Sequence, residues 1–270
     1  MVSVRGHRGL SDESGWCGPF NGRDEAQRAI EALFEVIHIR QCTPRITLRS
    51  MKTASPCALF DMKKCGAPCV GKESVDSYSS HVLTTRVALH HDATQILTEL
   101  EDRMKDLAEQ ERFEEAAEIR NRLGAFIRGT ARGQRIRSLT RVPHLIAALP
   151  IAPSRWEFIV VRHGKLAGTA QGTATNYKEV IDSLKLTADI VTDNGEILPA
   201  SHHEEVEVLL RYLNQDGIRL VDVEGEWSLP VFGSGAARDN LEKFREAADS
   251  LRYKEVFANS FERAAQRSTN

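Results

Sequence analysis

Apolar residues recur at three- and four-residue intervals through the first half of this chain. Residues 24–39 carry such a pattern, and Asp24 and Glu25 lie at the end where acidic side chains favour the helix dipole. The apolar positions of this segment are Ala26, Ile30, Leu33, Phe34 and Ile37. The pattern predicts a helix that leads directly into Cys42.

A second helical pattern covers residues 75–110, breaks at 109–112 and resumes over 113–127. Leu97, Leu100, Met104 and Leu107 form the apolar stripe of the first arm. Phe113, Ala116, Ala117, Leu123 and Ile127 form that of the second. Two matched stripes and a short connection predict an antiparallel helical hairpin. Two helices alone bury little apolar surface. We therefore expect a second hairpin, or an α+β domain formed by the second half of the chain, to cover them.

The second half of the chain has a different texture. β-branched and apolar residues dominate 144–151, 156–172 and 188–198, with His163-Gly164-Lys165 as a hairpin turn. Amphipathic helices are expected at 176–186 and 202–215, a last strand pair at 217–229 and a helix at 237–256. This half predicts a small α+β domain.

The whole chain is therefore expected to be an α+β multidomain protein. Its predicted parts are a flexible leader (1–20), a helix and cysteine-cluster region (21–80), a helical hairpin (81–130), a basic linker (131–144) and a C-terminal α+β domain (145–270).

Composition limits the partners that the chain can have. The 270 residues carry a formal net charge of −2, so any surface for nucleic acid must be local. No apolar run is long enough to span a membrane, and the first twenty residues contain no apolar signal core. We expect a soluble cytoplasmic protein with no membrane partner.

Four of the five cysteines lie in one short stretch, with the spacing C-x14-C-x7-C-x3-C. They are Cys42, Cys57, Cys65 and Cys69. Four thiolates complete a tetrahedral zinc site or a [4Fe–4S] cube, and the stretch lacks the C-x2-C pairs typical of structural zinc sites. The pattern favours a cluster, with zinc, or buried thiols and disulfides, as alternatives.

Positive charge accompanies these cysteines. The basic residues are Arg40, Arg45, Arg49, Lys52, Lys63, Lys64 and Lys72, with Asp61 as the only acid among them. Such a surface suits a nucleic-acid backbone, although the same charges could simply neutralise an anionic cluster. We favour DNA contact through Arg40, Lys63 and Lys64.

A switch in charge marks the end of the hairpin. Its flanks are acidic, and an acid-free arginine run follows at Arg122, Arg128, Arg132, Arg135, Arg137 and Arg141. Solvated helix faces would explain both, but the abrupt change favours an interaction module beside a second basic patch. Arg128, Arg132 and Arg135 are the DNA-binding candidates there.

No catalytic group can be assigned from the sequence. Glu179, Asp182 and Asp189 form no recognisable catalytic pair, and His202-His203-Glu204-Glu205 begins a helix. Adjacent residues on a helix project about 100° apart, so we expect the two histidines to diverge and not to share a metal ion.

Three segments resemble the UvrC family, whose founding member is the endonuclease subunit of bacterial nucleotide excision repair. GPFNGRDEAQRAIEALFEVIHIRQC (18–42) is similar to the family's linker and helix, and PCALFDMKKCGAPCVG (56–71) is similar to its cysteine stretch. FEEAAEIR (113–120) is similar to the UVR motif, matching at Phe113, Glu114, Ala116, Ala117 and Arg120. UvrC-like fusion proteins of actinobacteria are closer still.

This resemblance implies that the four cysteines hold an iron–sulfur cluster. It also implies that the hairpin docks a UvrB-like helicase subunit, through Phe113, Glu114, Ala116, Ala117 and Arg120. The family's GIY-YIG core, RNase H-type acid cluster and helix-hairpin-helix tail have no recognisable counterpart here. We expect a DNA-repair component without its own cutting site. The alternatives are a zinc-stabilised adaptor without DNA contact, and a metal-dependent nuclease with its site in the C-terminal domain.

Overall fold

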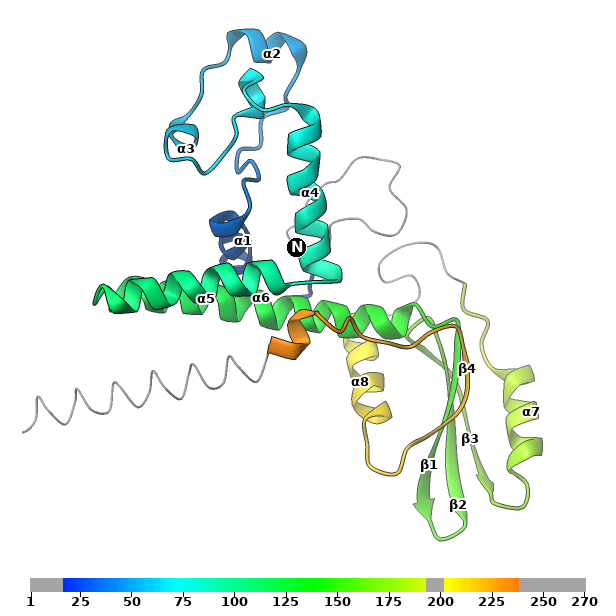
Figure 1. Cartoon of the computed structure of the whole chain (residues 1–270). Helices are drawn as coiled ribbons and strands as arrows, with labels where there is room; N and C mark the ends of the chain where they lie inside the picture. The colour runs from blue at the N-terminus through cyan, green and yellow to red at the C-terminus, as the bar shows by residue number, and fades with distance from the viewer. Residues whose placement is uncertain (1–16, 193–201, 238–270) are drawn as a thin grey trace, which may run out of the picture.

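The computed structural model describes residues 17–192 and 202–237 (Figure 1). Within these residues it contains eight α-helices and one four-stranded antiparallel sheet, so the predicted α+β class is confirmed. Figure 1 shows a helical unit, a small lobe above it and a separate sheet domain. No described helix combines the length and the apolar character that crossing a membrane requires.

The helical unit is built on three helices, α1 (Arg23–Val36), α5 (Thr94–Glu109) and α6 (Phe113–Thr140). α5 and α6 form the predicted hairpin, closed by a turn in which Glu111 adopts φ 59° and the Arg112 N–H donates to the Leu107 carbonyl at 2.9 Å. The expectation for the cover was wrong: α1 packs along α6 and buries Ala29 and Ala32 against the hairpin.

α4 (Val75–His90) is separate from α5, although the sequence pattern runs through both. The Thr94 N–H donates to Asp92 Oδ1 at 2.8 Å, which satisfies an end group of α5 and lets the helix restart after the turn at His91. α4 rises from the helical unit and connects it to the lobe (Figure 1).

The lobe contains short elements only: α2 (Leu48–Thr53), α3 (Ala58–Asp61) and a 3₁₀ turn at Pro68–Val70. Between Ile39 and Thr84, the described side chains include just two buried residues, Cys65 and Ala67. The lobe therefore has almost no apolar core of its own.

The sheet has the strand order β3-β2-β1-β4. Its strands are β1 (His144–Ala152), β2 (Arg155–Arg162), β3 (Lys165–Thr173) and β4 (Arg219–Glu224). α7 (Tyr177–Thr187) and α8 (His203–Leu213) cover opposite faces (Figure 1). Alternation explains the two layers: Leu145 and Ala147 face α8, whereas Ile146 and Ala148 face α7.

Most predictions for this domain are confirmed, including the turn between β2 and β3, where His163 and Gly164 adopt φ 48° and 75°. The expected strand pair at 217–229 is wrong, because β4 is a single strand paired with β1. Residues 188–192 form no strand. The rest of the segment 188–198 lies outside the described residues, as does nearly all of the helix expected at 237–256.

α6 connects the two cores and replaces the expected linker. Its 28 residues continue to Thr140, so residues 131–140 are helical, and only 141–143 lead into the sheet. Phe126 and Ile127 are buried in the helical unit, whereas Ile136 and Leu139 are buried under the sheet beside α8. One continuous helix thus fixes the sheet domain to the helical unit.

Candidate functional site

The four clustered cysteines lie in the lobe. Cys57 precedes α3, Cys69 lies in the 3₁₀ turn, and Cys65 is buried between them. Burial raises the pKa of the Cys65 thiol, and the charges of Cys42, Cys57 and Cys69 raise it further, so the three lie close enough to act on it electrostatically. In the part of the chain that the structure describes, no three of these sulfurs lie within 4.8 Å of one another.

The fifth cysteine belongs to a different environment. Cys17 packs against the helical core, and burial raises the pKa of its thiol to about 12. A thiol with such a pKa stays protonated and is a poor metal ligand. Cys17 is thus a core residue of the helical unit.

Two of the three predicted DNA-binding residues of the lobe hold other parts of the protein. Arg40 donates from Nε and Nη2 to the Cys42 carbonyl at 3.0 and 2.8 Å, and also to the Pro44 carbonyl. Lys64 Nζ lies 3.6 Å from Glu35 Oε1. Lys63 is exposed, with φ 56°. Of the three predicted contacts, Lys63 projects its charge most freely.

Glu35 on α1 collects three cations from three elements. Its carboxylate lies 2.9 Å from Arg103 of α5, 3.0 Å from Arg122 of α6 and 3.6 Å from Lys64 of the lobe. The Glu35 side chain is only 10% exposed, so little water competes for these contacts. This carboxylate joins the lobe to the hairpin.

The predicted DNA-binding arginines of α6 differ in their partners. Arg128 Nε donates to Glu25 at 2.8 Å. Burial alone would raise the pKa of Glu25, but the Arg128 and Asn21 hydrogen bonds hold it below its ordinary value. Arg132 forms a two-pronged ion pair with Glu207 of α8, which lowers the pKa of Glu207 and raises that of Arg132.

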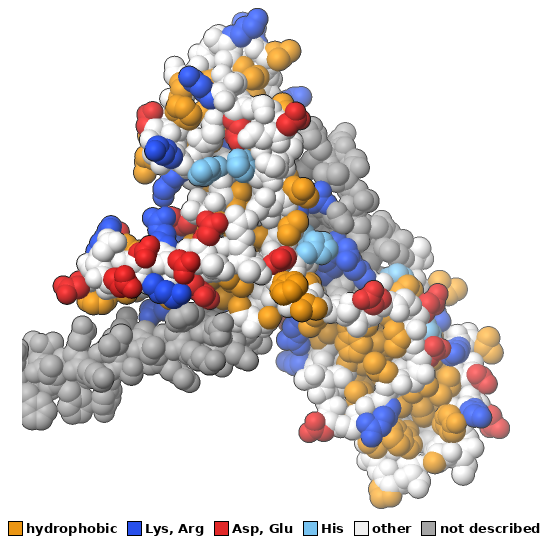
Figure 2. Space-filling model, in the orientation of Figure 1, with side chains coloured by type: hydrophobic (Ala, Val, Ile, Leu, Met, Phe, Trp, Pro, Cys, Tyr) orange, Lys and Arg blue, Asp and Glu red, His pale blue; other side chains and the backbone are white. Residues whose placement is uncertain are grey.

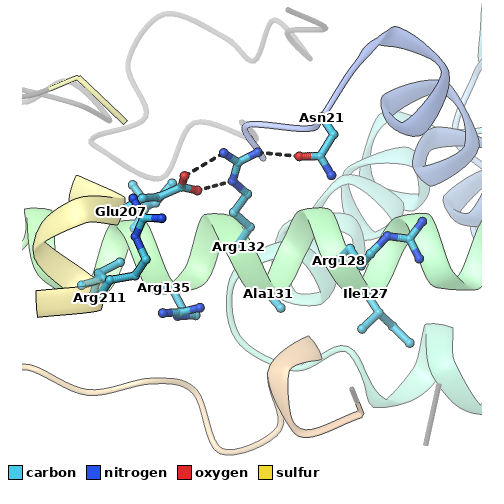
Figure 3. Close-up of a pocket in the computed structure, with 10 residues that line it drawn as sticks. Asn21, Ile127, Arg128, Ala131, Arg132, Arg135, Glu207 and Arg211 are labelled. Carbon is cyan, nitrogen blue, oxygen red and sulfur yellow. Dashed lines mark hydrogen bonds and ion pairs between the residues drawn. The ribbon is translucent and has the colours of Figure 1, made fainter. Parts of the chain in front are cut away.

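Arg135 makes no hydrogen bond or ion pair with another side chain in the described part of the chain, and it is exposed. Figure 3 shows it with Arg128, Arg132 and Arg211 around one cavity. The structure therefore brings Arg128, Arg132 and Arg135 together, but only Arg135 keeps its charge uncompensated.

The predicted partner-binding residues divide into two sets at the tip of the hairpin. Phe113 is 58% exposed at the first position of α6, and Glu114 beside it is also exposed. Ala116 is buried, and Ala117 and Arg120 are half-buried. The alanines thus serve the helix–helix contact, whereas Phe113 and Glu114 face solvent. Acidic side chains gather on the exposed face of the hairpin (Figure 2).

The expectation that His202 and His203 diverge is wrong. His202 has extended backbone and precedes α8, so the helical angle does not apply, and the two ring centroids are 4.4 Å apart. With Glu204 they form the only group of at least three His, Cys, Asp or Glu ligand atoms within 4.8 Å of one another among the described residues. His202 and Glu204 are exposed at 67% and 76%, as in an ordinary solvated first turn.

Three acidic side chains of the sheet domain form hydrogen bonds or ion pairs within that domain. Asp222 lies 2.6 Å from Lys185, and Glu157 accepts the hydroxyl hydrogen of Tyr212 at 2.7 Å. Glu205 accepts the Leu166 N–H at 3.0 Å. These carboxylates brace the sheet against its helices.

Comparison with known proteins agrees with this arrangement of lobe and hairpin. The model of the UvrC/Cho excinuclease middle domain matches residues 1–87, and that of the UvrB/UvrC motif matches residues 94–126. In these two regions the chain is similar to UvrC-type proteins. The two matches place the cysteine lobe within the middle domain, and the α5–α6 hairpin carries the UVR motif.

Curated relatives extend the similarity into the sheet domain. A Mycobacterium tuberculosis protein named as a bifunctional exonuclease/endonuclease is 28% identical over 77% of this chain and 32% of its own length. UvrABC system protein C of Shewanella oneidensis is 28% identical over 75% of this chain and 35% of its own. That of Rickettsia bellii is 34% identical over 47% and 19%. The chain spans about a third or less of these relatives. No solved structure matches it.

The sequence did not indicate which carboxylates form ion pairs with the arginines. Glu25, Glu35 and Glu207 lie on helices whose surfaces look ordinarily solvated in the sequence. Their partners are 75 to 103 residues away along the chain for Arg132–Glu207, Arg122–Glu35 and Arg128–Glu25. No local pattern reports a pairing of that range. Arg211 was missed as well, because it is one isolated arginine on α8 and no local pattern places it beside the arginines of α6.

Proposed function

We propose that this chain is the DNA-contacting, partner-docking portion of a UvrC-type nucleotide excision repair protein. The observation that carries the proposal concerns the tip of the hairpin. Within the matched UVR motif, Phe113 and Glu114 are exposed, whereas Ala116 is buried in the helical core. An exposed aromatic side chain on a rigid hairpin is the kind of anchor that protein interfaces use. The partner proposed for it is a UvrB-like helicase subunit.

The second part of the proposal is a structural [4Fe–4S] cluster on Cys42, Cys57, Cys65 and Cys69. A single zinc ion, with Zn–S bonds of about 2.3 Å, would hold its sulfurs about 3.8 Å apart. A cube binds each thiolate to a different iron and so needs a wider set of sulfurs, which suits the long, unequal spacing of the four cysteines along the chain. The lobe has almost no core, so folding of residues 40–75 would depend on the bound group.

The third part is contact with DNA along the arginine surface of α6 and the lobe. Arg40 and Lys64 support the fold of the lobe through Cys42 and Glu35 while they add positive charge to it. Lys63 and Arg135 are the cations most available for phosphates. Binding is expected to be modest and to weaken steeply with salt.

Recruitment to a preformed complex tests this function. A UvrB-like protein is loaded on bubbled duplex DNA, and this chain is added in a native gel or an anisotropy assay. We expect a ternary complex with the wild-type chain and a reduced yield with Phe113→Ala. A matched control is Phe60→Ala, which removes a phenyl ring from α3 outside the UVR motif. No ternary complex with the wild-type chain would refute the proposed function.

The same reagents address the runner-up, a nuclease with its site in the sheet domain. Incubation of the chain alone with bubbled DNA and Mg²⁺ or Mn²⁺ should leave both strands intact. Cleavage that disappears on substitution of an acid in the sheet domain would favour the nuclease instead.

A further inference from the structure

An arginine-lined cavity lies where the helical unit meets the sheet domain. Its volume is about 330 Å³, and its walls come from the segment before α1, from α6 and from α8 (Figure 3). The charged residues that line it are Arg128, Arg132 and Arg135 from α6, and Glu207 and Arg211 from α8. In Figure 2, Lys and Arg side chains lie along this junction.

Two of the four arginines are neutralised within the fold. Arg132 binds Glu207 through both Nε and Nη2, and its Nη1 donates to Asn21 Oδ1 at 3.1 Å. Arg128 is held by Glu25 at 2.8 Å. These pairs shape the wall of the cavity. Because both guanidinium groups already have carboxylate partners, they are poorly placed to bind an incoming anion.

Arg135 and Arg211 have no such partner. Neither side chain makes a hydrogen bond or an ion pair within residues 17–192 and 202–237, and both are exposed. Four guanidinium groups against Glu207 and Glu25 leave two positive charges at the cavity. Glu204, one turn earlier on α8, acts on Arg132 only through space. The site thus keeps a net attraction for an anion.

We infer that this cavity binds a phosphate group, with Arg135 and Arg211 as its two principal ligands. The guanidinium fork donates two parallel hydrogen bonds to phosphate oxygens, which suits a phosphate better than a point charge would. A volume near 330 Å³ lies at the small end of ligand pockets and accepts a phosphate with part of its attached group.

The source favoured for this phosphate is a nucleic-acid backbone, and this choice rests on the proposed DNA contact. The cavity lies on the arginine-bearing helix α6, so a strand that lies along α6 would place one phosphate between the two domains. A free phosphate or nucleotide would satisfy the same chemistry. The test therefore has one arm for each source.

In the first arm, inorganic phosphate is titrated into the full chain without DNA, and the arginine Nε–Hε signals are followed by NMR. Arg135 and Arg211 should shift together and saturably. Arg219, an exposed arginine of β4 whose side chain donates to the neighbouring Ile218 carbonyl, should not shift. Arg135→Gln combined with Arg211→Gln should abolish the response. No saturable shift at either residue would overturn the phosphate site.

In the second arm, the affinity for bubbled duplex DNA is measured across a salt series. The double variant should bind about tenfold more weakly, and the log–log salt slope should become shallower by about 1, since the contact with one backbone phosphate is lost. Arg219→Gln should leave both values unchanged. Arg135→Lys with Arg211→Lys keeps the charge but loses the forks, so the slope should persist while affinity falls.

The two arms keep this inference separate from the proposed function. Phosphate-induced shifts with unchanged DNA affinity would retain the phosphate site and assign it to a free phosphate or nucleotide. A wild-type chain that binds no DNA would refute the proposed DNA contact, and the phosphate titration would still decide the cavity. If both arms are negative while the wild-type chain binds DNA, the inference alone fails.

Discussion

The ring of Phe20 occupies the space that a side chain at position 129 would need. A Cβ placed on Gly129 would lie 1.9 Å from Cε1 of Phe20, far inside any real contact. One turn further along α6, a Cβ on Gly133 would lie 3.0 Å from the Gly18 carbonyl oxygen. The two glycines form a groove in α6 that receives the segment leading into α1.

Gly129→Ala should therefore destabilise the protein, by about 1–3 kcal/mol in the free energy of unfolding, because the methyl group overpacks this contact. At an open helix position the same change would stabilise by about 0.5–1 kcal/mol. Urea unfolding of the single variant measures the sign. In a Phe20→Ala background, which vacates the space, Gly129→Ala should become neutral or stabilising. Stabilisation of the wild-type background would show that Phe20 does not lie in this groove.

The same glycines explain where sequence reasoning stopped short. The apolar pattern of the second arm was followed only to residue 127, and a basic linker was expected over 131–144. The structure continues the helix to Thr140, because the glycines serve as contact surface for Phe20 and Gly18. Periodicity located α1, the two arms of the hairpin, β1 to β3 and the β2–β3 turn, since those signals are local, whereas the strand expected at 188–192 and the strand pair expected at 217–229 were wrong. It could not show which carboxylate each arginine would meet.

Glu35 should contribute more to stability than its neighbour on the same helix. Glu35→Gln leaves Arg103, Arg122 and Lys64 without their shared carboxylate, and we expect a loss of about 2 kcal/mol in the free energy of unfolding. Glu31→Gln is the matched control: Glu31 is 36% exposed and, among the described cations, contacts only Arg122, so the change should cost well under 1 kcal/mol.

Limited proteolysis adds a local readout for Glu35. Because Lys64 connects the lobe to Glu35, Glu35→Gln should speed cleavage within residues 40–75 more than elsewhere. Equal stability of the two variants, with unchanged cleavage of the lobe, would mean that Glu35 does not join the lobe to the hairpin.

His90 should make stability depend on pH. Burial lowers the pKa of His90 to about 4, and neighbouring positive charges add to the effect. These neighbours are Arg137, His91, Arg141 and Arg86, and Glu226 lines the adjacent cavity. In the unfolded chain His90 has its ordinary pKa of about 6.5. Below this pH the unfolded chain therefore binds a proton at His90 that the folded chain does not bind. This contribution is complete above pH 6.5 and is lost as the pH falls towards 4.

The slope from this one group is at most about 1.4 kcal/mol per pH unit. His90→Gln should flatten the fall in stability between pH 6.5 and 4.5, as measured by urea unfolding at several pH values. His202→Gln, which removes an exposed histidine, is the control and should leave the slope unchanged. A wild-type slope in the His90 variant would contradict the assignment.

Cys65→Ser should separate a cluster from the other uses of the cysteines. Anaerobically purified wild-type protein is expected to be brown, with broad absorbance near about 400 nm and bound iron and sulfide. The variant should lose this absorbance and become protease-sensitive within residues 40–75, because ligand binding and local folding are coupled. Cys17→Ser, outside the lobe, should keep the colour. Stoichiometric zinc without iron or sulfide in the wild type would replace the cluster with a zinc site.

The docking role of the hairpin is the centre of this account, and calorimetric titration of the chain with a UvrB-like C-terminal hairpin tests it most directly. Phe113 lies exposed at the tip, so Phe113→Ala should leave the thermal unfolding midpoint nearly unchanged while weakening association by more than about 1 kcal/mol. Ala116→Ser, at the buried neighbour, should instead lower the midpoint. A wild-type chain that releases no binding heat, or a Phe113 variant that binds with wild-type affinity, would mean that the hairpin only braces the fold.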